Sequence, residues 1–291
     1  MLEVEISGIK MKNPLMLASG ICDLTKKSME KFSYAGAIVT KSVGIEERKG
    51  YKNPVFCETE CGILNAIGLS NPGVDEYIKE ICEIKVENLI ASIFGKDENE
   101  FYNVAEKISS YVKAIEMNMS CPHAEKVGME YPSDEIKFAV ENVKKTGKPV
   151  FVKLGMENIL ERAEKAIEGG ADAIVAINSI RAMKICIELG IPILGNKIGG
   201  YSGKGIKPVG VRCVYEVAQN FDLPVIGVGG IMNAEDVIEY MMAGANAVQI
   251  GSLLYYEGEE VFRKICKNLE EWLDRNGYSK INDIIGIALK K

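Results

Sequence analysis

The stretch Gly170-Ala-Asp-Ala-Ile-Val-Ala-Ile177 decides the fold, because its pattern occurs three times along the chain. A glycine and small residues lead into a run of β-branched or other apolar residues, which predicts a buried strand. The same form occurs in Tyr34-Ala-Gly-Ala-Ile-Val-Thr-Lys41 and in Gly244-Ala-Asn-Ala-Val-Gln-Ile250. At 170 and 244 the glycine follows an amphipathic segment, and a glycine there can end a helix by adopting a positive φ.

Helices are predicted between such strands. Apolar residues at 159, 160, 163, 166 and 167 form one helical stripe, and a second stripe runs from Val237 to Met242 with Asn233 as its N-cap. Further helices are expected over 99–113 and 134–145. Eight short apolar runs alternate with the helical segments, at 14–18, 37–41, 88–93, 114–118, 149–154, 172–177, 224–228 and 247–251.

Alternating strands and helices predict a parallel sheet, and eight such units predict a closed (β/α)8 TIM barrel. An open, doubly wound sheet is the alternative. We expect residues 1–291 to form a single domain. Two stretches, 43–86 and 178–223, are too long for simple loops, so we expect insertions that build or cover an active site at the C-terminal rim.

Composition excludes several classes of protein. The 35 basic and 41 acidic residues leave a net charge of −6, which argues against a nucleic-acid-binding face. No 18-residue apolar run or secretory signal is present, and the eight cysteines are scattered. We therefore expect a cytoplasmic protein whose cysteines are mostly buried free thiols. A single histidine, with Cys57 and Cys61 lacking further ligands nearby, leads us to expect no metal site.

Polar residues and glycines follow the predicted strands, at the end where barrel enzymes carry their catalytic groups. They are Ser19-Gly20, Lys41-Ser42, Asn118, Lys153, Asn178-Ser179, Gly229-Gly230 and Gly251-Ser252. Glycine turns after the seventh and eighth strands favour a phosphate site, although glycines that only make tight turns are the simpler interpretation.

Lys153 ends the buried run Val-Phe-Val-Lys, and an ammonium is costly to bury without a partner. It either forms a Schiff base with a carbonyl substrate or offsets negative charge on a flavin. Cys121 lies in the loop after Asn118, where a thiol facing a pocket can act as a base, or is simply a structural cysteine.

The segment Asn118-Met-Ser-Cys-Pro-His123 resembles the catalytic-loop signature of the class 1 dihydroorotate dehydrogenases. Other blocks similar to that family are Ala18-Ser-Gly20, Lys41-Ser42, Asn65-Ala-Ile-Gly-Leu-Ser-Asn71, Asn178-Ser179, Gly199–Pro208, Gly227–Ile231 and Gly244–Ser252. The region from Lys207 to Ser252 is most similar to the catalytic subunit of the NAD-dependent, two-subunit type.

The resemblance implies an FMN flavoenzyme that oxidises dihydroorotate to orotate in pyrimidine biosynthesis. Cys121 would remove the C5 proton while the C6 hydride passes to FMN. The FMN ligands it implies are Ser19, Lys41, Ser42, Asn118, Lys153, Ile177 and Gly203, with Gly229, Gly230, Gly251 and Ser252 at the phosphate. The substrate ligands it implies are Lys41, Asn65, Ala66, Ile67, Gly68, Leu69, Asn118, Asn178 and Ser179.

His123 departs from this pattern, because many family members have a substrate-contacting asparagine there. Cys-Pro-His also resembles dihydropyrimidine dehydrogenases that reduce uracil and thymine, so that activity stays open, as do a lyase using Lys153 and a barrel that only anchors a partner. Lys41, which can pair with a carboxylate, favours the acid substrate.

Electron transfer to NAD has no route within this chain, since it shows neither a dinucleotide fingerprint nor iron–sulfur cysteine spacing. The resemblance implies a partner subunit carrying FAD and a [2Fe–2S] cluster, in a heterotetramer built on a homodimer of barrels. A homodimer that works alone and reduces fumarate or a dye is the alternative.

Overall fold

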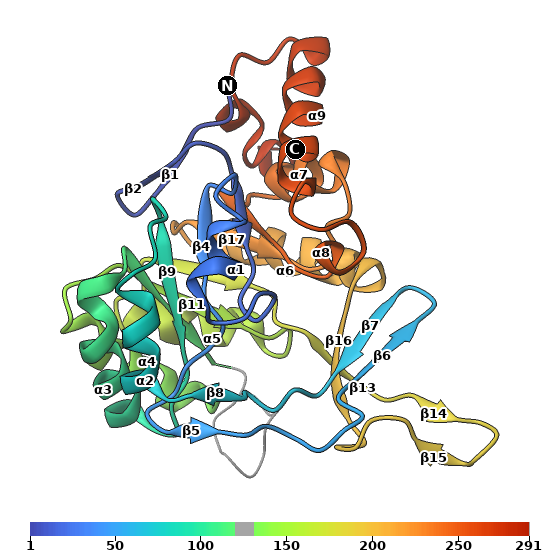
Figure 1. The fold of residues 1–291 in the computed structure, drawn as a ribbon. Coiled ribbons are helices and arrows are strands. Elements are labelled where there is room, and N and C mark those ends of the chain that lie inside the picture. The colour runs from blue at the N-terminus through green and yellow to red at the C-terminus, as the bar shows by residue number, and fades with distance from the viewer. Residues whose placement is uncertain (120–130, 291) are drawn as a thin grey trace.

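The computed structural model describes residues 1–119 and 131–290, and eight strands of this part close into a parallel barrel (Figure 1). Around the ring the order is β10, β11, β12, β17, β18, β3, β4 and β9. The bounds are β3 Leu15–Leu17, β4 Ala37–Val39, β9 Leu89–Ile93, β10 Ala114–Asn118, β11 Val150–Leu154, β12 Ala173–Ala176, β17 Val225–Val228 and β18 Ala247–Ile250. Each strand lies inside one predicted run, so the TIM barrel is confirmed and the open sheet is wrong.

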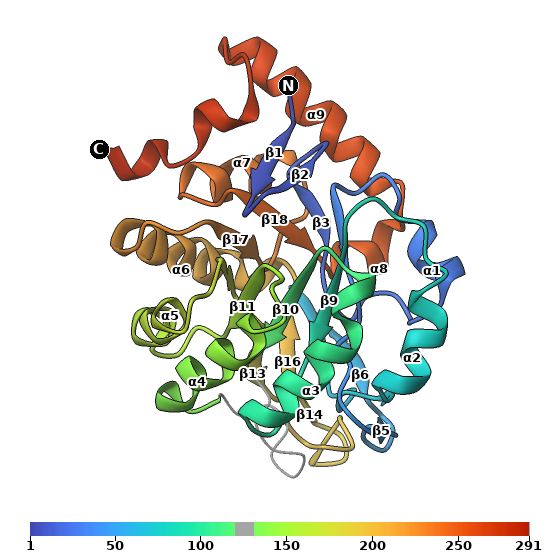
Figure 2. The ribbon, with the colours of Figure 1, turned by 90° about the vertical axis from the view of Figure 1, so that its left-hand side faces the viewer.

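Helices surround the barrel and bury their apolar faces against it (Figure 2). They are α1 Lys26–Glu30, α2 Val74–Ile81, α3 Glu98–Ile108, α4 Ser133–Lys144, α5 Ile159–Glu168, α6 Lys207–Asn220, α7 Ala234–Met242, α8 Leu253–Glu257 and α9 Val261–Asn276. Short 3-10 helices occupy Ser109–Tyr111, Lys204–Ile206, Ile281–Ile284 and Ile287–Lys290. The helix predicted over 99–113 is therefore too long, because its last residues form a 3-10 turn.

The predicted helix ends are confirmed. The Asn233 side chain caps α7 by accepting from the backbone amide of Asp236 at 2.9 Å. Gly170 and Gly244 follow α5 and α7 with φ of 90° and 116°, a region that side-chain-bearing residues rarely adopt. These two glycines turn the chain from helix to strand, as the opening pattern requires.

The two long insertions meet in one four-stranded antiparallel sheet at one end of the barrel. Its order is β13 (Ile180–Ala182), β16 (Gly199–Ser202), β7 (Gly62–Asn65) and β6 (Phe56–Thr59). Two smaller ribbons, β5 (Glu47–Arg48) with β8 (Asn71–Pro72) and β14 (Ile185–Cys186) with β15 (Ile191–Pro192), lie at the same end (Figures 1 and 2).

The N-terminal hairpin of β1 (Val4–Ile6) and β2 (Ile9–Met11) lies at the opposite end (Figures 1 and 2). Ser7 Oγ donates to the Asp172 carbonyl at 2.8 Å, just before β12. Asn88 Nδ2 donates to the Lys10 carbonyl at 2.8 Å, just before β9. Since these contacts reach the starts of the strands, the insertion sheet covers their C-terminal ends.

All seven cysteines in the described part of the chain are free thiols, which fits the expected absence of a disulfide framework. Their expected burial is wrong, because only Cys213 and Cys266 are fully buried, while Cys61 and Cys82 are exposed. Within residues 1–119 and 131–290, no helix has both the length and the apolar character needed to cross a membrane.

Candidate active site

A chain of hydrogen bonds connects polar side chains at or near the C-terminal ends of five barrel strands. Ser42 is its centre: its Oγ lies 3.3 Å from Ser19 Oγ and 2.8 Å from Ser92 Oγ, and it accepts from Asn118 Nδ2 at 3.2 Å. Asn178 Nδ2 then donates to Asn118 Oδ1 at 3.0 Å. The structure thus brings together four residues predicted from strand ends. Ser92 was missed, although a polar residue between Ala91 and Ile93 in an apolar strand was a signal.

Lys41 provides a cation beside this network. Its Nζ donates to Ser70 Oγ at 3.0 Å and lines a hollow of about 360 Å³. Burial lowers the pKa of the Lys41 ammonium below the ordinary lysine value, while the nearby Asp23 carboxylate opposes that shift. Among residues 1–119 and 131–290 no carboxylate forms an ion pair with Lys41, so this half-buried cation is well placed to receive an anionic ligand.

The segment after β7, predicted to hold substrate, runs from the insertion sheet back toward Lys41. Asn65 lies at the end of β7, and its Nδ2 donates to the Gly200 carbonyl at 3.5 Å. Gly68 and Leu69 both have positive φ, 78° and 55°, and turn the chain toward Ser70. Ala66 is buried, whereas Ile67 is exposed to 37%.

Three buried polar side chains form a closed ring in the barrel interior. Lys153 Nζ donates to Gln249 Oε1 at 2.9 Å and lies 3.6 Å from Glu116 Oε1, and Gln249 Nε2 donates to Glu116 Oε2. Their exposed fractions are 6%, 1% and 0%. The partner expected for a buried Lys153 is therefore present, but sequence reasoning identified neither Glu116 nor Gln249. Both interrupt apolar runs, as Lys153 does.

The glycine turn after β17 is held rigidly from outside. Gly229 and Gly230 have φ of 122° and 70°, and Tyr240 Oη donates to the Gly229 carbonyl at 2.7 Å. Lys207 Nζ pairs with Asp236 Oδ1 at 2.7 Å, and the bonds to Asp236 and Glu239 raise the Lys207 pKa. A Cβ on Gly230 would come within 2.7 Å of the Lys207 backbone, so tight packing alone already requires this glycine.

Gly251, after β18, is different, because the fold does not require a glycine there. A Cβ on it would meet nothing nearer than 3.4 Å, and its φ is not in the left-handed region. A bare backbone beside Ser252 fits close approach by a ligand such as a phosphate. The donor set thus fits the phosphate end of a flavin mononucleotide.

Three further predicted residues adjoin these groups. The Ile177 amide donates to the Val228 carbonyl at 3.1 Å, which places Ile177 beside the Gly229 turn. Gly203 follows β16 with φ of 104° and lies so close to Gly62 that a Cβ on Gly203 would be 2.6 Å from the Gly62 Cα. The Ser179 amide donates to Asn178 Oδ1 at 2.8 Å and so orients that amide.

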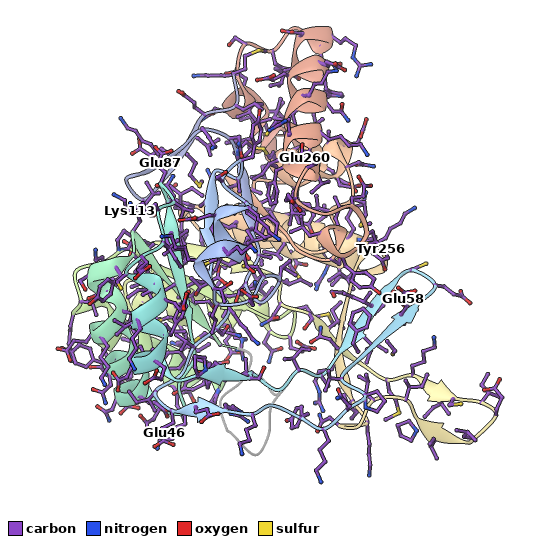
Figure 3. All side chains as sticks on the ribbon, in the orientation of Figure 1. Glu46, Glu58, Glu87, Lys113, Tyr256 and Glu260 are labelled. Atoms are coloured by element: carbon purple, nitrogen blue, oxygen red, sulfur yellow. The ribbon has the colours of Figure 1, made fainter. Side chains whose placement is uncertain are left out.

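On the flank of this end, the β6–β7 hairpin packs against α8. The Phe56 and Tyr255 rings lie 5.0 Å apart, and Tyr255 Oη donates to Glu58 Oε1 at 2.9 Å. Figure 3 labels Glu58, on the hairpin side of this contact, and Tyr256, which adjoins Tyr255 on the helix side. The hairpin that adjoins Gly203 is thereby anchored to the helix that follows Ser252.

Cys121 and His123 lie outside the described residues, but the ends of the segment that carries them are described. The Tyr131 amide donates to the Met119 carbonyl at 2.8 Å. The buried Arg162 guanidinium donates to the carbonyls of Tyr131 at 2.7 Å and of Met119 at 3.3 Å. Arg162 was missed, although it is a cation next to the apolar stripe of α5. Met119 and Tyr131, which flank that segment, are therefore held together directly after Asn118.

Comparisons with known proteins identify the family to which the chain belongs. The family model described as dihydroorotate dehydrogenase matches residues 1–273. The chain is 46% identical over 301 residues to a Methanocaldococcus jannaschii protein, covering 99% of this chain and 98% of the relative. It is 45% identical to a protein of Pyrococcus abyssi, covering 100% of both chains. Both relatives are named "Dihydroorotate dehydrogenase B (NAD(+)), catalytic subunit". Similarity over the full length of these relatives shows that the chain belongs to the dihydroorotate dehydrogenase family.

Proposed function

We propose that the chain forms one FMN-binding barrel domain that oxidises dihydroorotate to orotate in pyrimidine biosynthesis. Full-length similarity to relatives named for this reaction supports the activity. For the site, one observation carries the proposal: hydrogen bonds connect Ser42, Asn118 and Asn178 at the end of the barrel where Lys153 is the register partner of Asn118.

FMN, when bound, accepts a hydride from substrate. The residues proposed to hold its ring and ribityl chain are Ser19, Lys41, Ser42, Asn118, Lys153, Ile177 and Gly203. Those proposed to hold its phosphate are Gly229, Gly230, Gly251 and Ser252. The Lys153 ammonium would offer positive charge to the reduced flavin, and the Ser42 hydroxyl and Asn118 amide would help to hold it.

Dihydroorotate is proposed to lie against the amide groups of the rim. Asparagine amides both donate and accept, which matches the imide edge of a pyrimidine. Lys41 pairs with the substrate carboxylate, and Asn65, Ala66, Ile67, Gly68, Leu69, Asn118, Asn178 and Ser179 complete the proposed substrate set. Cys121, as a thiolate, removes the C5 proton, and loss of the C6 hydride leaves the C5–C6 double bond of orotate.

The ring around Lys153 argues against a Schiff-base lyase. Schiff-base formation needs a neutral, nucleophilic amine. Lys153 Nζ is instead already engaged within the buried ring, where it donates to Gln249 Oε1 and lies 3.6 Å from Glu116 Oε1. The half-buried Lys41 favours an acid substrate over uracil or thymine, because a neutral pyrimidine leaves that cation unpaired.

A partner subunit is proposed to receive the electrons. The relatives' name, "catalytic subunit", implies a second subunit in their enzymes. We propose that two barrels pair and that each binds a partner carrying FAD and a [2Fe–2S] cluster, which relays electrons to NAD. The free thiols of all seven described cysteines fit a cytoplasmic location.

Steady-state assays test these proposals together. The purified chain should oxidise dihydroorotate with an artificial dye as acceptor, should leave dihydrouracil essentially unoxidised, and should reduce NAD only after the partner is added. Oxidation of dihydrouracil at a similar rate would favour the dihydropyrimidine alternative. Efficient fumarate reduction, or NAD reduction by this chain alone, would show that the partner is unnecessary.

A further inference from the structure

The buried ring formed by Lys153, Glu116 and Gln249 spans the barrel interior. In the eight-strand order, β18 is four places from β10 in either direction, so Gln249 reaches across from the wall opposite Glu116. Glu116 lies two residues before Asn118 on β10 and shares its inward face, one level deeper. The ring thus lies directly below the polar rim.

The chemistry of the three groups fixes how the Gln249 amide is oriented. An ammonium only donates and a carboxylate only accepts, so Oε1 must face Lys153 and Nε2 must face Glu116. Turning the amide over would place donor against donor and acceptor against acceptor. Gln249 is therefore bonded at both ends in a single orientation.

We infer that Gln249 and Glu116 are positioning residues that together set where the Lys153 charge lies and how much of it reaches the flavin. The ammonium has three donors, of which one bonds to Gln249 Oε1, while Glu116 Oε1 lies 3.6 Å away. The ammonium is therefore still able to donate to a flavin bound at the rim. Gln249 holds Lys153 at hydrogen-bond distance and away from direct contact with Glu116. This inference rests on the proposed function.

The two ring partners should affect the charge at the flavin with opposite signs. Without Gln249, the ammonium can collapse onto Glu116, and a closer carboxylate neutralises more of its charge. Glu116→Gln keeps the size of the side chain and its acceptor for Gln249 Nε2, but an amide nitrogen replaces the carboxylate oxygen that faces Lys153, and the neutralising charge is lost. Positive charge beside the flavin favours the reduced, more negative form.

The test is the midpoint potential of FMN in the purified holoenzyme. Gln249→Leu should lower it and Glu116→Gln should raise it, each by at least tenfold in the equilibrium constant, which is about 30 mV for a two-electron couple. A purely structural role would reduce thermal stability in both variants without this divergence in sign. Val248→Ala is the matched control, because it alters the same strand on its opposite, fully buried face. It should lower the melting temperature and leave the potential unchanged.

Shifts of less than twofold, or shifts of the same sign, would overturn the inference. If Gln249→Leu does not fold, Gln249→Asn serves in its place, since its shorter amide cannot reach both partners. If the wild type binds FMN and oxidises dihydroorotate but the variants leave the midpoint potential unshifted, only the role of the ring is contradicted. A wild-type chain that takes up no flavin would overturn the proposed function as well.

Discussion

Replacing Lys153 with Met is predicted to destabilise the flavin-free protein by about 4 kcal/mol. The side chains of Lys153 and Glu116 are only 8% and 0% exposed, so solvent hardly screens their 3.6 Å interaction. At an effective dielectric constant of about 20, that separation corresponds to roughly 4–5 kcal/mol. The loss of one partner of a buried pair typically costs about 3–5 kcal/mol, because the remaining charge stays buried.

The assay is thermal and urea unfolding of cofactor-free protein in a double-mutant cycle. At about 2–4 °C per kcal/mol, Lys153→Met should lower the melting temperature by roughly 8–16 °C. Adding Glu116→Gln should recover at least about 2 kcal/mol, because the uncompensated carboxylate is gone. Lys41→Met is the control: burial already disfavours that ammonium, so its removal should cost little. A loss below about 1 kcal/mol in Lys153→Met, or no recovery in the double variant, would refute this reasoning.

Three further predictions concern the reaction. Cys121→Ser should slow flavin reduction by orders of magnitude with FMN still bound, and wild-type flavin reduction should accelerate toward pH ~8.5 as the thiol ionises. Stopped-flow absorbance follows both rates. A near-normal rate in the variant would show that Cys121 is not the base. Lys41→Met should raise KM for dihydroorotate about tenfold or more. In the wild type KM should rise as the pH increases through the lowered pKa of Lys41, below 10.5, and this rise should be absent from the variant. Arg162→Met should lower the free energy of unfolding by about 2–4 kcal/mol, because the carbonyls of Met119 and Tyr131 lose their buried donor. It should also reduce turnover more than FMN affinity, and urea unfolding and FMN titration measure these effects. Unchanged turnover would contradict a role for Arg162 in holding the Cys121 segment.

The barrel could be predicted from sequence because its signals are local. Runs such as Ala173–Ala176 are short, apolar and preceded by a glycine with positive φ, so each strand can be recognised without knowledge of its neighbours. The insertion sheet has no such signal. Its strands are three or four residues long, and β6, β13 and β16 are only partly buried. In addition, β7 pairs with β16, more than a hundred residues later in the chain. Pairing at that separation depends on the closed barrel, which brings the two insertions together.

Site residues that follow the ends of strands could be predicted from the sequence, whereas those deeper in the barrel were missed. Ser42, Asn118 and Asn178 end strands and join one network. Glu116 and Gln249 sit within strands, and their role depends on a contact across the barrel that no local pattern encodes. The prediction that the cysteines are mostly buried failed for a similar reason. Cys61 is exposed because it lies in the turn of the β6–β7 hairpin, which the sequence does not reveal.

The central claim is that this barrel holds FMN and oxidises dihydroorotate, and an anaerobic titration followed by absorption tests it most directly. The purified protein should be yellow and show the visible absorption bands of a bound flavin. One equivalent of dihydroorotate per FMN should bleach the longer-wavelength band, whereas dihydrouracil should leave it intact. A colourless protein that cannot be loaded with FMN, or a bound flavin that dihydroorotate does not bleach, would contradict the account.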